Sequence, residues 1–432
     1  MFKPTLTCWG GVGTVTGANF LLGTEKLKVM VDCGMTQGMD APDPAEQDKF
    51  DYDPTSIDFL FITHAHVDHI GRIHKLVRAG FKGVIYSTFE TKEIADLMIR
   101  DLLHIEGVNP EEVEKCMKLW QGLKYHEPKD FGDFKLELFD AGHILGSTMY
   151  KFTFPSGKSI FFTGDLGNSP SPLLKNTEEV TDLTYLLMDS VYGDRNHESA
   201  EERDKKFADV IADVVKRRST LLIPSFSLER TQILLYELKK IFESGLVPRV
   251  PVYLDSPLAI RVTEIYRRVL PHGKDLFDFP KLKETTEARD SMEIDRSDGA
   301  KIILAGSGMS TAGRIVHHEA RFLPHADATL LFVGYQAVGT LGRMIQEGMK
   351  QVIINNQTIE VRAKVVTING FSAHAGSDQL VNFVSHTAKS LKNVFITMGE
   401  PKSSIFLAQR LHDELDVNAI VPERGKVYEL DL

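Results

Sequence analysis

Cysteine is scarce in this chain: 432 residues contain only Cys8, Cys33 and Cys116, and none of them belongs to a Cys-x-x-Cys pair. This excludes a disulfide framework and a zinc finger built from thiolates. Long apolar runs are also missing. No run reaches the roughly 18 residues that a membrane-spanning helix needs, and the amino-terminal residues lack the basic and apolar segments of a signal peptide. We therefore expect a cytoplasmic protein with no membrane partner.

An excess of basic residues is absent as well. The chain has 50 Lys and Arg against 60 Asp and Glu, which gives a net charge of -10. Attachment to nucleic acid through overall charge is therefore excluded, whereas a locally basic groove is not. Residues 201–360 carry nearly equal numbers of basic and acidic residues, so the acidic excess lies outside them.

The length predicts two to three domains, and the strand and helix patterns change along the chain. The first third reads as short strands, with a hairpin turn at 23–26, a surface loop at 40–58 and a helix at 110–123. The middle alternates strands with helices, which is typical of parallel βαβ units and predicts a second α/β domain. Toward the end, strands are predicted at 362–375 and 392–400.

A dense group of histidines follows the apolar segment IDFLFIT, in the sequence Thr-His-Ala-His-Val-Asp-His at 63–69. Alternate side chains of an extended chain point the same way, so His64 and His66 can face one centre. Asp68 and His69 then come from the following turn. Three imidazoles and a carboxylate suit zinc or a similar divalent ion. The alternative, a coincidental polar cluster, is disfavoured because such groups are costly to crowd together without a metal.

Two further positions share one context, an apolar strand followed by glycine and a ligand-type residue. His143 follows KLELFDAG and Asp165 follows SIFFTG. Either could be an ordinary loop residue, but loops at strand ends are where α/β proteins collect their ligands, so we expect both at the metal. Asp32 has the same context and is expected to orient a ligand histidine.

These motifs resemble the metallo-β-lactamase superfamily, and the middle segments look like its β-CASP branch. Members of that branch are nucleic-acid hydrolases, including the endonuclease of mRNA 3′-end cleavage and ribonuclease J. The segments that carry the resemblance are IPSFSLERTQILLYEL, VYLDSPLA, ILAGSGMSTAGRIVHH, VGYQAVGTLGR and NGFSAHA. The resemblance covers nearly the whole chain. It implies an αββα sandwich formed by residues 1–194 and 361–432, with an inserted α/β β-CASP domain of mainly parallel sheet at 195–360.

The resemblance also implies roles for the site residues, with one or two zinc ions per chain. One ion is held by His64, His66, His143 and Asp165, and the other by Asp68, His69 and Asp165. Asp68, Asp189 and His374 are the implied catalytic residues. His374 is expected to contact the scissile phosphate or to protonate the leaving oxygen, and Asp189 to orient it. His197 matches a family histidine beyond the Tyr-Gly and is expected beside the ligands.

One family position does not match. The family often has a histidine before a late Gly-Glu, where this chain has Met398. A thioether is a poor zinc ligand beside oxygen and imidazole donors. The second ion therefore has one protein ligand fewer, which leaves three alternatives: it exchanges readily, another group completes its site, or it is absent.

The middle segment is expected to supply a groove for nucleic acid. Basic side chains and a tight glycine turn at strand ends are candidates for phosphate contacts. The candidates are Arg230, Ser307, Gly308, Arg314 and Arg343. For each arginine, a surface salt bridge is an equally good interpretation.

The leading hypothesis is a zinc-dependent ribonuclease that hydrolyses RNA phosphodiester bonds through a zinc-activated water. Its partner is expected to be single-stranded RNA, and related enzymes often pair as homodimers. Endonuclease and exonuclease activity both stay open. A weakly active or non-catalytic RNA-binding protein is the first alternative, because of Met398. A small-molecule metallohydrolase is the second, although the inserted domain argues for a larger substrate.

Overall fold

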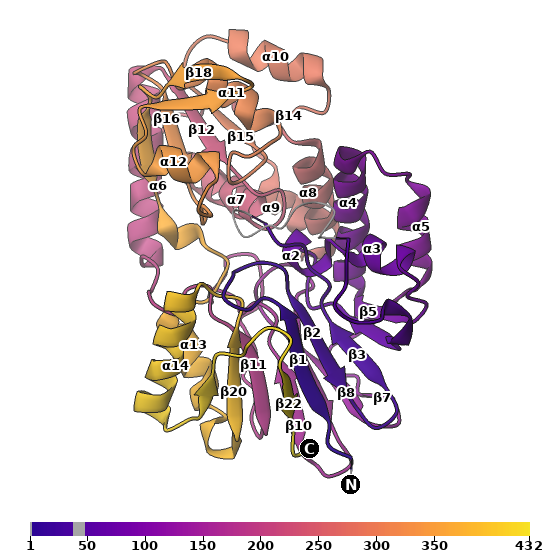
Figure 1. The fold of residues 1–432 in the computed structure, drawn as a ribbon. Helices are drawn as coiled ribbons and strands as arrows, with labels where there is room; N and C mark the ends of the chain where they lie inside the picture. Colours follow the sequence, from indigo (N-terminus) through magenta and orange to yellow (C-terminus); the bar gives the residue numbers. More distant parts are fainter. Residues whose placement is uncertain (1, 38–47) are drawn as a thin grey trace. The chain divides into compact units, whose positions relative to one another are not determined.

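Two structural units make up the computed structural model, which describes residues 2–37 and 48–432 (Figure 1). The first unit comprises the chain up to Asn196 together with His374–Leu432, and the second comprises His197–Ala373. The second unit thus extends past the predicted end of the insert at 360. The reason is β19 (Lys364–Thr367), which pairs in parallel with β16 (Thr329–Phe332) and so belongs to the sheet of the second unit.

The first unit contains two seven-stranded sheets. The strands of one sheet, in spatial order, are β22 (Val427–Glu429), β1 (Thr5–Gly10), β2 (Asn19–Gly23), β3 (Lys28–Val31), β4 (Phe59–Phe61), β5 (Val84–Thr88) and β6 (Trp120–Leu123). Those of the other are β21 (Ala419–Ile420), β20 (Asn393–Thr397), β11 (Tyr185–Asp189), β10 (Ser159–Phe162), β9 (Thr148–Thr153), β8 (Lys135–Asp140) and β7 (Lys129–Asp130). The predicted hairpin is confirmed, since β2 and β3 pair antiparallel.

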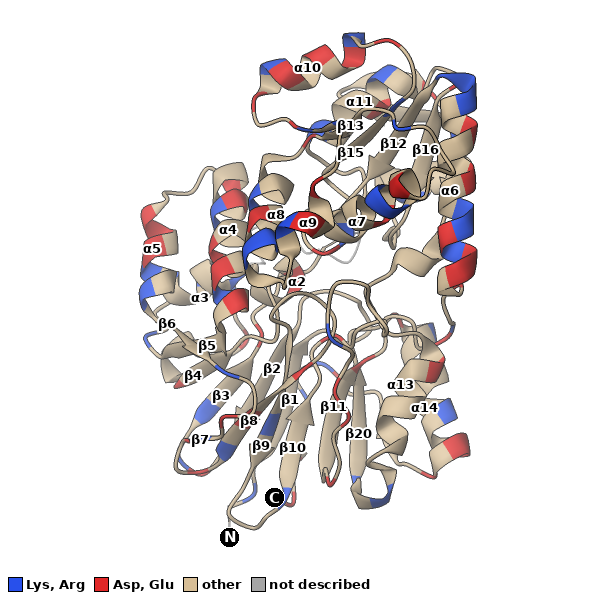
Figure 2. Cartoon of the chain, turned by 180° about the vertical axis from the view of Figure 1, so that it is seen from behind, with Lys and Arg blue, Asp and Glu red and all other residues tan. Residues whose placement is uncertain are grey.

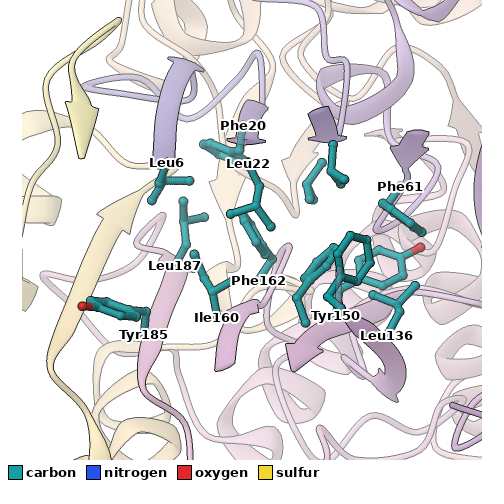
Figure 3. Close-up of a cluster of buried hydrophobic side chains, with 14 of the residues drawn as sticks. Leu6, Phe20, Leu22, Phe61, Leu136, Tyr150, Ile160, Phe162, Tyr185 and Leu187 are labelled. Carbon is teal, nitrogen blue, oxygen red and sulfur yellow. The ribbon is translucent and has the colours of Figure 1, made fainter. Parts of the chain in front are cut away.

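A hydrophobic core fills the space between these two sheets (Figure 3). Leu6 and Phe20 from the first sheet meet Ile160, Phe162 and Leu187 from the second. Each fully buried side chain of this kind contributes about 1.5–3 kcal/mol relative to an exposed one. The core therefore fixes the two sheets face to face, and with them the strand ends that carry the polar motifs.

Helices cover the outer faces, which confirms the predicted αββα sandwich. Leu380 of α13 and Leu407 of α14 pack against Phe161 and Ile396 on the outer face of the second sheet. The helices of the first unit are α2 (Val67–Ile70), α3 (Ile73–Arg78), α4 (Phe89–Glu106), α5 (Glu111–Lys118), α13 (Ser377–Ser385) and α14 (Pro401–Leu415).

The second unit is built on a six-stranded sheet whose strand pairs are all parallel, as the strand–helix alternation predicted. Its order is β14 (Leu282–Glu284), β13 (Val252–Leu254), β15 (Lys301–Ala305), β12 (Thr220–Pro224), β16 and β19. The helices are α6 (Ala200–Arg217), α7 (Arg230–Glu243), α8 (Pro257–Val269), α9 (Gly273–Phe277), α10 (Ala288–Arg296), α11 (Arg314–Phe322) and α12 (Leu341–Gln346), with a hairpin of β17 (Gln351–Ile354) and β18 (Gln357–Glu360).

Charge in the second unit lies mainly on its helices and at the edges and ends of its sheet. Figure 2 shows Lys and Arg alternating with Asp and Glu along α6 and α10, whereas the central strands are largely uncharged. β12 and β15 are buried along their whole length, which is typical of parallel strands covered on both faces. At the start of α6, Ser199 and Glu202 form a capping box that satisfies the first free N–H groups.

Some predicted boundaries were wrong. The helix predicted at 110–123 ends at Lys118, because Trp120 instead joins the sheet edge beside β5 and its Nε1–H donates to Ser87 Oγ at 2.8 Å. The strand predicted at 362–375 ends at Thr367. Residues 40–47 of the predicted loop lie outside the described residues, and Pro54–Ser56 forms a short 3-10 helix. Among the helices that the structure describes, none has the length and apolarity needed to cross a membrane.

Candidate metal centre

The predicted metal ligands of the first unit lie just after strands of both of its sheets. His64 follows β4, and His66 is the residue directly before α2, in extended conformation. His143 lies between β8 and β9, and Asp165 follows β10. Because the hydrophobic core aligns these strands, segments distant in sequence deliver their polar side chains to one place.

The first group of donor atoms comes from His64, His66, His143 and Asp165, all within 4.8 Å of one another. His66 Nδ1 is 3.1 Å from His64 Nε2 and 3.3 Å from His143 Nε2. Asp165 Oδ2 lies 3.5 Å from His64 Nε2 and 3.7 Å from His143 Nε2. Three nitrogens and one oxygen therefore surround a common centre.

This geometry fits a divalent metal ion. Four donors about 2.0–2.1 Å from a tetrahedral zinc ion lie about 3.3 Å apart, close to the spacings found here. His64, His143 and Asp165 are at most 2% exposed. Within the described residues, Asp165 Oδ1 is also buried and has no hydrogen-bond partner, which costs free energy unless a cation compensates it. The donor set and its burial thus match a metal site better than a hydrogen-bonded network.

The protonation states favour ligation. Burial lowers the pKa of His64 well below its usual value, with His69 acting in the same direction, so its imidazole is neutral and has a lone pair to offer. Burial alone would raise the pKa of Asp165, but the adjacent His69 and His64 hold it well below its usual range. The Asp165 carboxylate is therefore ionised.

Asp32 and Thr63 hold the histidines in place. Asp32 is fully buried, and its carboxylate accepts hydrogen bonds from Thr63 N–H (2.8 Å), Thr63 Oγ1 (2.8 Å) and His69 Nδ1 (2.7 Å). Thr63 Oγ1 also lies 3.0 Å from His64 Nδ1. The sequence interpretation missed Thr63, although a hydroxyl residue directly before the histidine motif at a strand end was the available signal. Gly164, at φ +56°, lets the Asp165 loop pass so close to Thr63 that a Cβ would lie 2.7 Å from Thr63 Cβ.

Asp68 and His69 lie beside the first group. His69 Nε2 is 3.4 Å from Asp165 Oδ2 and 3.8 Å from Asp68 Oδ2. Burial opposes a charge on His69, yet the carboxylates of Asp165, Asp32 and Asp68 raise its pKa well above the usual value. The side chain of Met398 belongs to the hydrophobic core with Phe20.

Asp189 and His374 meet Asp165 on another side. Donor atoms of these three residues also lie within 4.8 Å of one another. Asp189 ends β11, and His374 is brought in by a backbone bridge to Gly167, two residues after Asp165. Both residues were expected as catalytic residues from the resemblance, and the structure brings them to the edge of the candidate metal centre.

The residues expected to contact phosphate in the second unit are mostly engaged by their own unit. Arg314 donates to Asp255 Oδ1 (2.7 Å) and to the carbonyls of Thr285 (3.0 Å) and Thr286 (2.6 Å), which indicates a structural role. The other candidates have different surroundings: Arg230 is buried at 7% exposure, Arg343 pairs with Glu347, Ser307 Oγ accepts from the backbone of Thr311 and Ala312, and Gly308 lies against Phe226. His197 is half-buried and is the first residue of the second unit.

Known proteins resemble the chain in both of its units. A family model described as the Beta-Casp domain matches residues 231–345. One described as a Zn-dependent metallo-hydrolase RNA specificity domain matches 358–422, and one described as anti-Pycsar protein Apyc1 matches 13–197. A solved structure of a protein of unknown function from Enterococcus faecalis V583 has a TM-score of 0.61 at 15% identity over 99% of this chain and 100% of that one, which supports the fold alone.

Curated relatives extend over almost the whole sequence. Ribonuclease TTHA0252 of Thermus thermophilus is 32% identical over 417 residues, which cover 93% of this chain and 95% of the relative. Transcription termination factor FttA of Thermococcus kodakarensis is 30% identical over 454 residues, covering 96% of this chain and 70% of the relative. With the histidine and aspartate cluster in the αββα unit and the parallel sheet in the inserted unit, the chain belongs to the β-CASP branch of the metallo-β-lactamase superfamily, a family of RNA-processing nucleases.

Proposed function

We propose that this protein is a zinc-dependent ribonuclease that hydrolyses phosphodiester bonds in single-stranded RNA. The observation that carries the proposal is the convergence of His64, His66, His143 and Asp165 on one buried centre. The similarity to a named ribonuclease over 95% of that relative supports RNA as the substrate. Three imidazoles and one carboxylate are a donor set that suits zinc.

In this proposal the chain's own residues divide the work of hydrolysis. His64, His66, His143 and Asp165 hold the ion. When bound there, zinc supplies a water whose pKa falls to about 7 and a positive charge beside a phosphoryl oxygen. His374 lies within reach of Asp165 and donates a proton to the phosphate or to the leaving oxygen, and Asp189 orients its ring.

The decisive experiment measures metal content and RNA cleavage together. Purified protein and the His66→Ala variant are assayed for bound zinc by mass spectrometry and for cleavage of an end-labelled single-stranded RNA. We expect bound zinc and cleavage in the natural protein, and loss of both in His66→Ala and after chelation. His104→Ala, which removes an exposed histidine of α4, is the matched control and should behave as the natural protein.

The other outcomes separate the alternatives. RNA binding without cleavage under any divalent metal would identify a non-catalytic RNA-binding protein. This alternative arises because Met398 stands where the family often has a ligand histidine. Turnover of thioesters or lactams without RNA cleavage would identify a small-molecule hydrolase. The products of cleavage, internal fragments or mononucleotides, decide between endonuclease and exonuclease action. The homodimer expected from the resemblance is tested by measuring the mass of the protein in solution.

A further inference from the structure

Met398 cannot serve as a metal ligand in this fold, because its side chain is part of the hydrophobic core. The residue is 2% exposed and clusters with Phe20. Its sulfur packs over Gly11, where a Cβ would come within 2.5 Å of Sδ. The backbone is fixed as well, since its N–H donates to Gly11 O at 2.7 Å and its carbonyl accepts from Ser190 N–H at 3.3 Å. The position at which the family often has a histidine therefore presents no donor to the centre.

Asp189, by contrast, presents an unused oxygen. The residue is 1% exposed, and its Oδ1 accepts a hydrogen bond from Leu166 N–H at 3.1 Å. Among the described residues, its Oδ2 is buried without any hydrogen-bond partner. A buried carboxylate oxygen without a donor costs free energy, so the native protein is expected to compensate it with a cation.

Backbone pairing holds His374 next to these carboxylates. Ala375 N–H donates to Leu166 O at 2.7 Å, and His374 bridges to Gly167. As a result, His374 Nδ1 lies 3.7 Å from Asp165 Oδ2. The positions of both the imidazole and Asp165 are therefore set by the main chain of the same two segments.

Asp165, Asp189 and His374 together form a second group of three donors. Two of the three are buried carboxylates, Asp165 and Asp189, and each has one oxygen without a hydrogen-bond partner within the described part of the chain. Like charges in a low-dielectric interior repel each other, and a cation between them converts the repulsion into attraction. Asp165 Oδ2 lies near His64 and His143 of the first group and near His374 Nδ1 of the second, so this carboxylate is shared by the two groups.

We propose that a second divalent cation binds between Asp165, Asp189 and His374, and not at the Asp68–His69 position that the family pattern implies. This inference rests on the proposed function, since it assumes that the first group holds zinc. The second group offers two carboxylates and one imidazole, a harder donor set than that of the first, so it suits Mn²⁺ better than the first group does. Ligation through His374 Nδ1 and proton donation through Nε2 use different nitrogens of the ring, so both proposed roles of this residue are compatible.

The test is a titration of the zinc-loaded protein with Mn²⁺. The concentration of unbound Mn²⁺ at each point is measured from its electron paramagnetic resonance signal. The natural protein, holding one zinc, should bind one Mn²⁺ per chain. His374→Gln and Asp189→Asn should weaken Mn²⁺ binding by at least about 100-fold, because each removes a direct ligand and even outer partners are worth 10–100-fold. Retention of the first zinc in each variant shows that the site is still folded.

Two further variants make the test discriminating. Asp68→Asn removes a ligand of the family position and should leave Mn²⁺ binding little changed. Met398→Leu preserves the core packing without sulfur and should also leave it unchanged. Loss of Mn²⁺ in Asp68→Asn with retention in His374→Gln overturns the inference, as does a natural protein that binds no Mn²⁺. These Mn²⁺ binding measurements are separate from the measurements of RNA cleavage and of zinc loss in His66→Ala, which test the proposed function.

Discussion

Each unit contains a buried cluster of carboxylates and histidines, and the two clusters differ in how their polar atoms are paired. In the second unit, Asp255 is fully buried and every oxygen of its carboxylate accepts hydrogen bonds. Thr285 and Arg314 donate to Oδ1 at 2.5 and 2.7 Å, and Ser291 and His318 donate to Oδ2 at 2.5 and 2.7 Å. This cluster is complete without any ion.

The cluster of the first unit is not complete by itself. The nitrogens of His64, His66 and His143 face one another at 3.1 to 3.3 Å, and Asp165 and Asp189 each keep a buried oxygen without a partner. The difference teaches that residue types do not distinguish a metal site from a structural network. What distinguishes them is whether the lone pairs point at donors of the protein or at a shared centre.

The largest expected effect comes from removing a ligand of the first cluster. His66→Ala deletes one of the donor atoms that surround the centre, so zinc is lost and RNA cleavage falls by about four orders of magnitude or more, the scale seen when one member of a catalytic unit is removed. Stability should change little, since His66 is only partly buried. Cleavage that persists within about tenfold would contradict the role of the cluster, because removing even an outer partner of a ligand costs 10–100-fold.

The corresponding change in the second cluster should act on stability and not on metal. Asp255→Ala leaves Arg314 and His318 buried without their shared partner, and breaking a buried pair in this way costs about 3–5 kcal/mol. Hydrogen exchange should show loosening around α10 and α11, because Ser291 and His318 on these helices both bind Asp255. Zinc content should stay at the natural level. A loss of zinc would show that the two clusters are coupled.

The sequence named the residues that the structure brings together in the first cluster but not those of the second, for a physical reason. His64 and His66 lie in one motif at a strand end, so local geometry already brings them together. Asp255 and His318 come from β13 and α11, and only the packed sheet reveals that they meet. For the same reason Arg314 was expected at a groove, although its partners hold it inside the second unit.

The limits of local sequence patterns also explain the other differences between the predictions and the structure. The αββα arrangement and the parallel insert followed from hydrophobic periodicity together with the family resemblance. The direction of the Met398 side chain did not, because it depends on close packing with Gly11 and Phe20 from the opposite end of the chain. β19 was assigned to the wrong unit, since an apolar strand carries no mark of the sheet that it joins.

A smaller expected effect is a dependence of stability on pH that arises from a buried carboxyl group of the second unit. Glu319 of α11 is fully buried, and burial raises its pKa to about 8 although Ser310 donates a hydrogen bond to it. Between its usual pKa of about 4.3 and this value, the folded protein holds a proton that the unfolded chain has lost, so stability falls as pH rises by about 1.4 kcal/mol per pH unit.

Glu319→Gln should lower the measured slope by this amount. Urea unfolding of the second unit, measured at about pH 5 and about pH 6.5, gives the difference between the natural protein and the variant. This interval avoids the titration of His318. Its raised pKa also makes stability fall as pH rises, but only above its usual pKa of about 6.5. Equal slopes in both proteins would mean that Glu319 is ionised in the folded state.

The smallest expected change tests whether a charge outside either cluster reaches RNA. Arg343 of α12 pairs with Glu347 at 2.6 Å, and such a surface pair contributes about 0.5 kcal/mol or less, so Arg343→Ala should barely alter stability. If the arginine also contacts a phosphate, RNA affinity weakens and the dependence of log affinity on log salt becomes shallower by about one unit. Glu347→Ala is the matched control: it breaks the same pair but keeps the cation, so a weaker affinity in Arg343→Ala alone assigns the contact to the guanidinium. Equal effects of both variants would mean that loss of the pair, and not of the positive charge, weakens RNA binding.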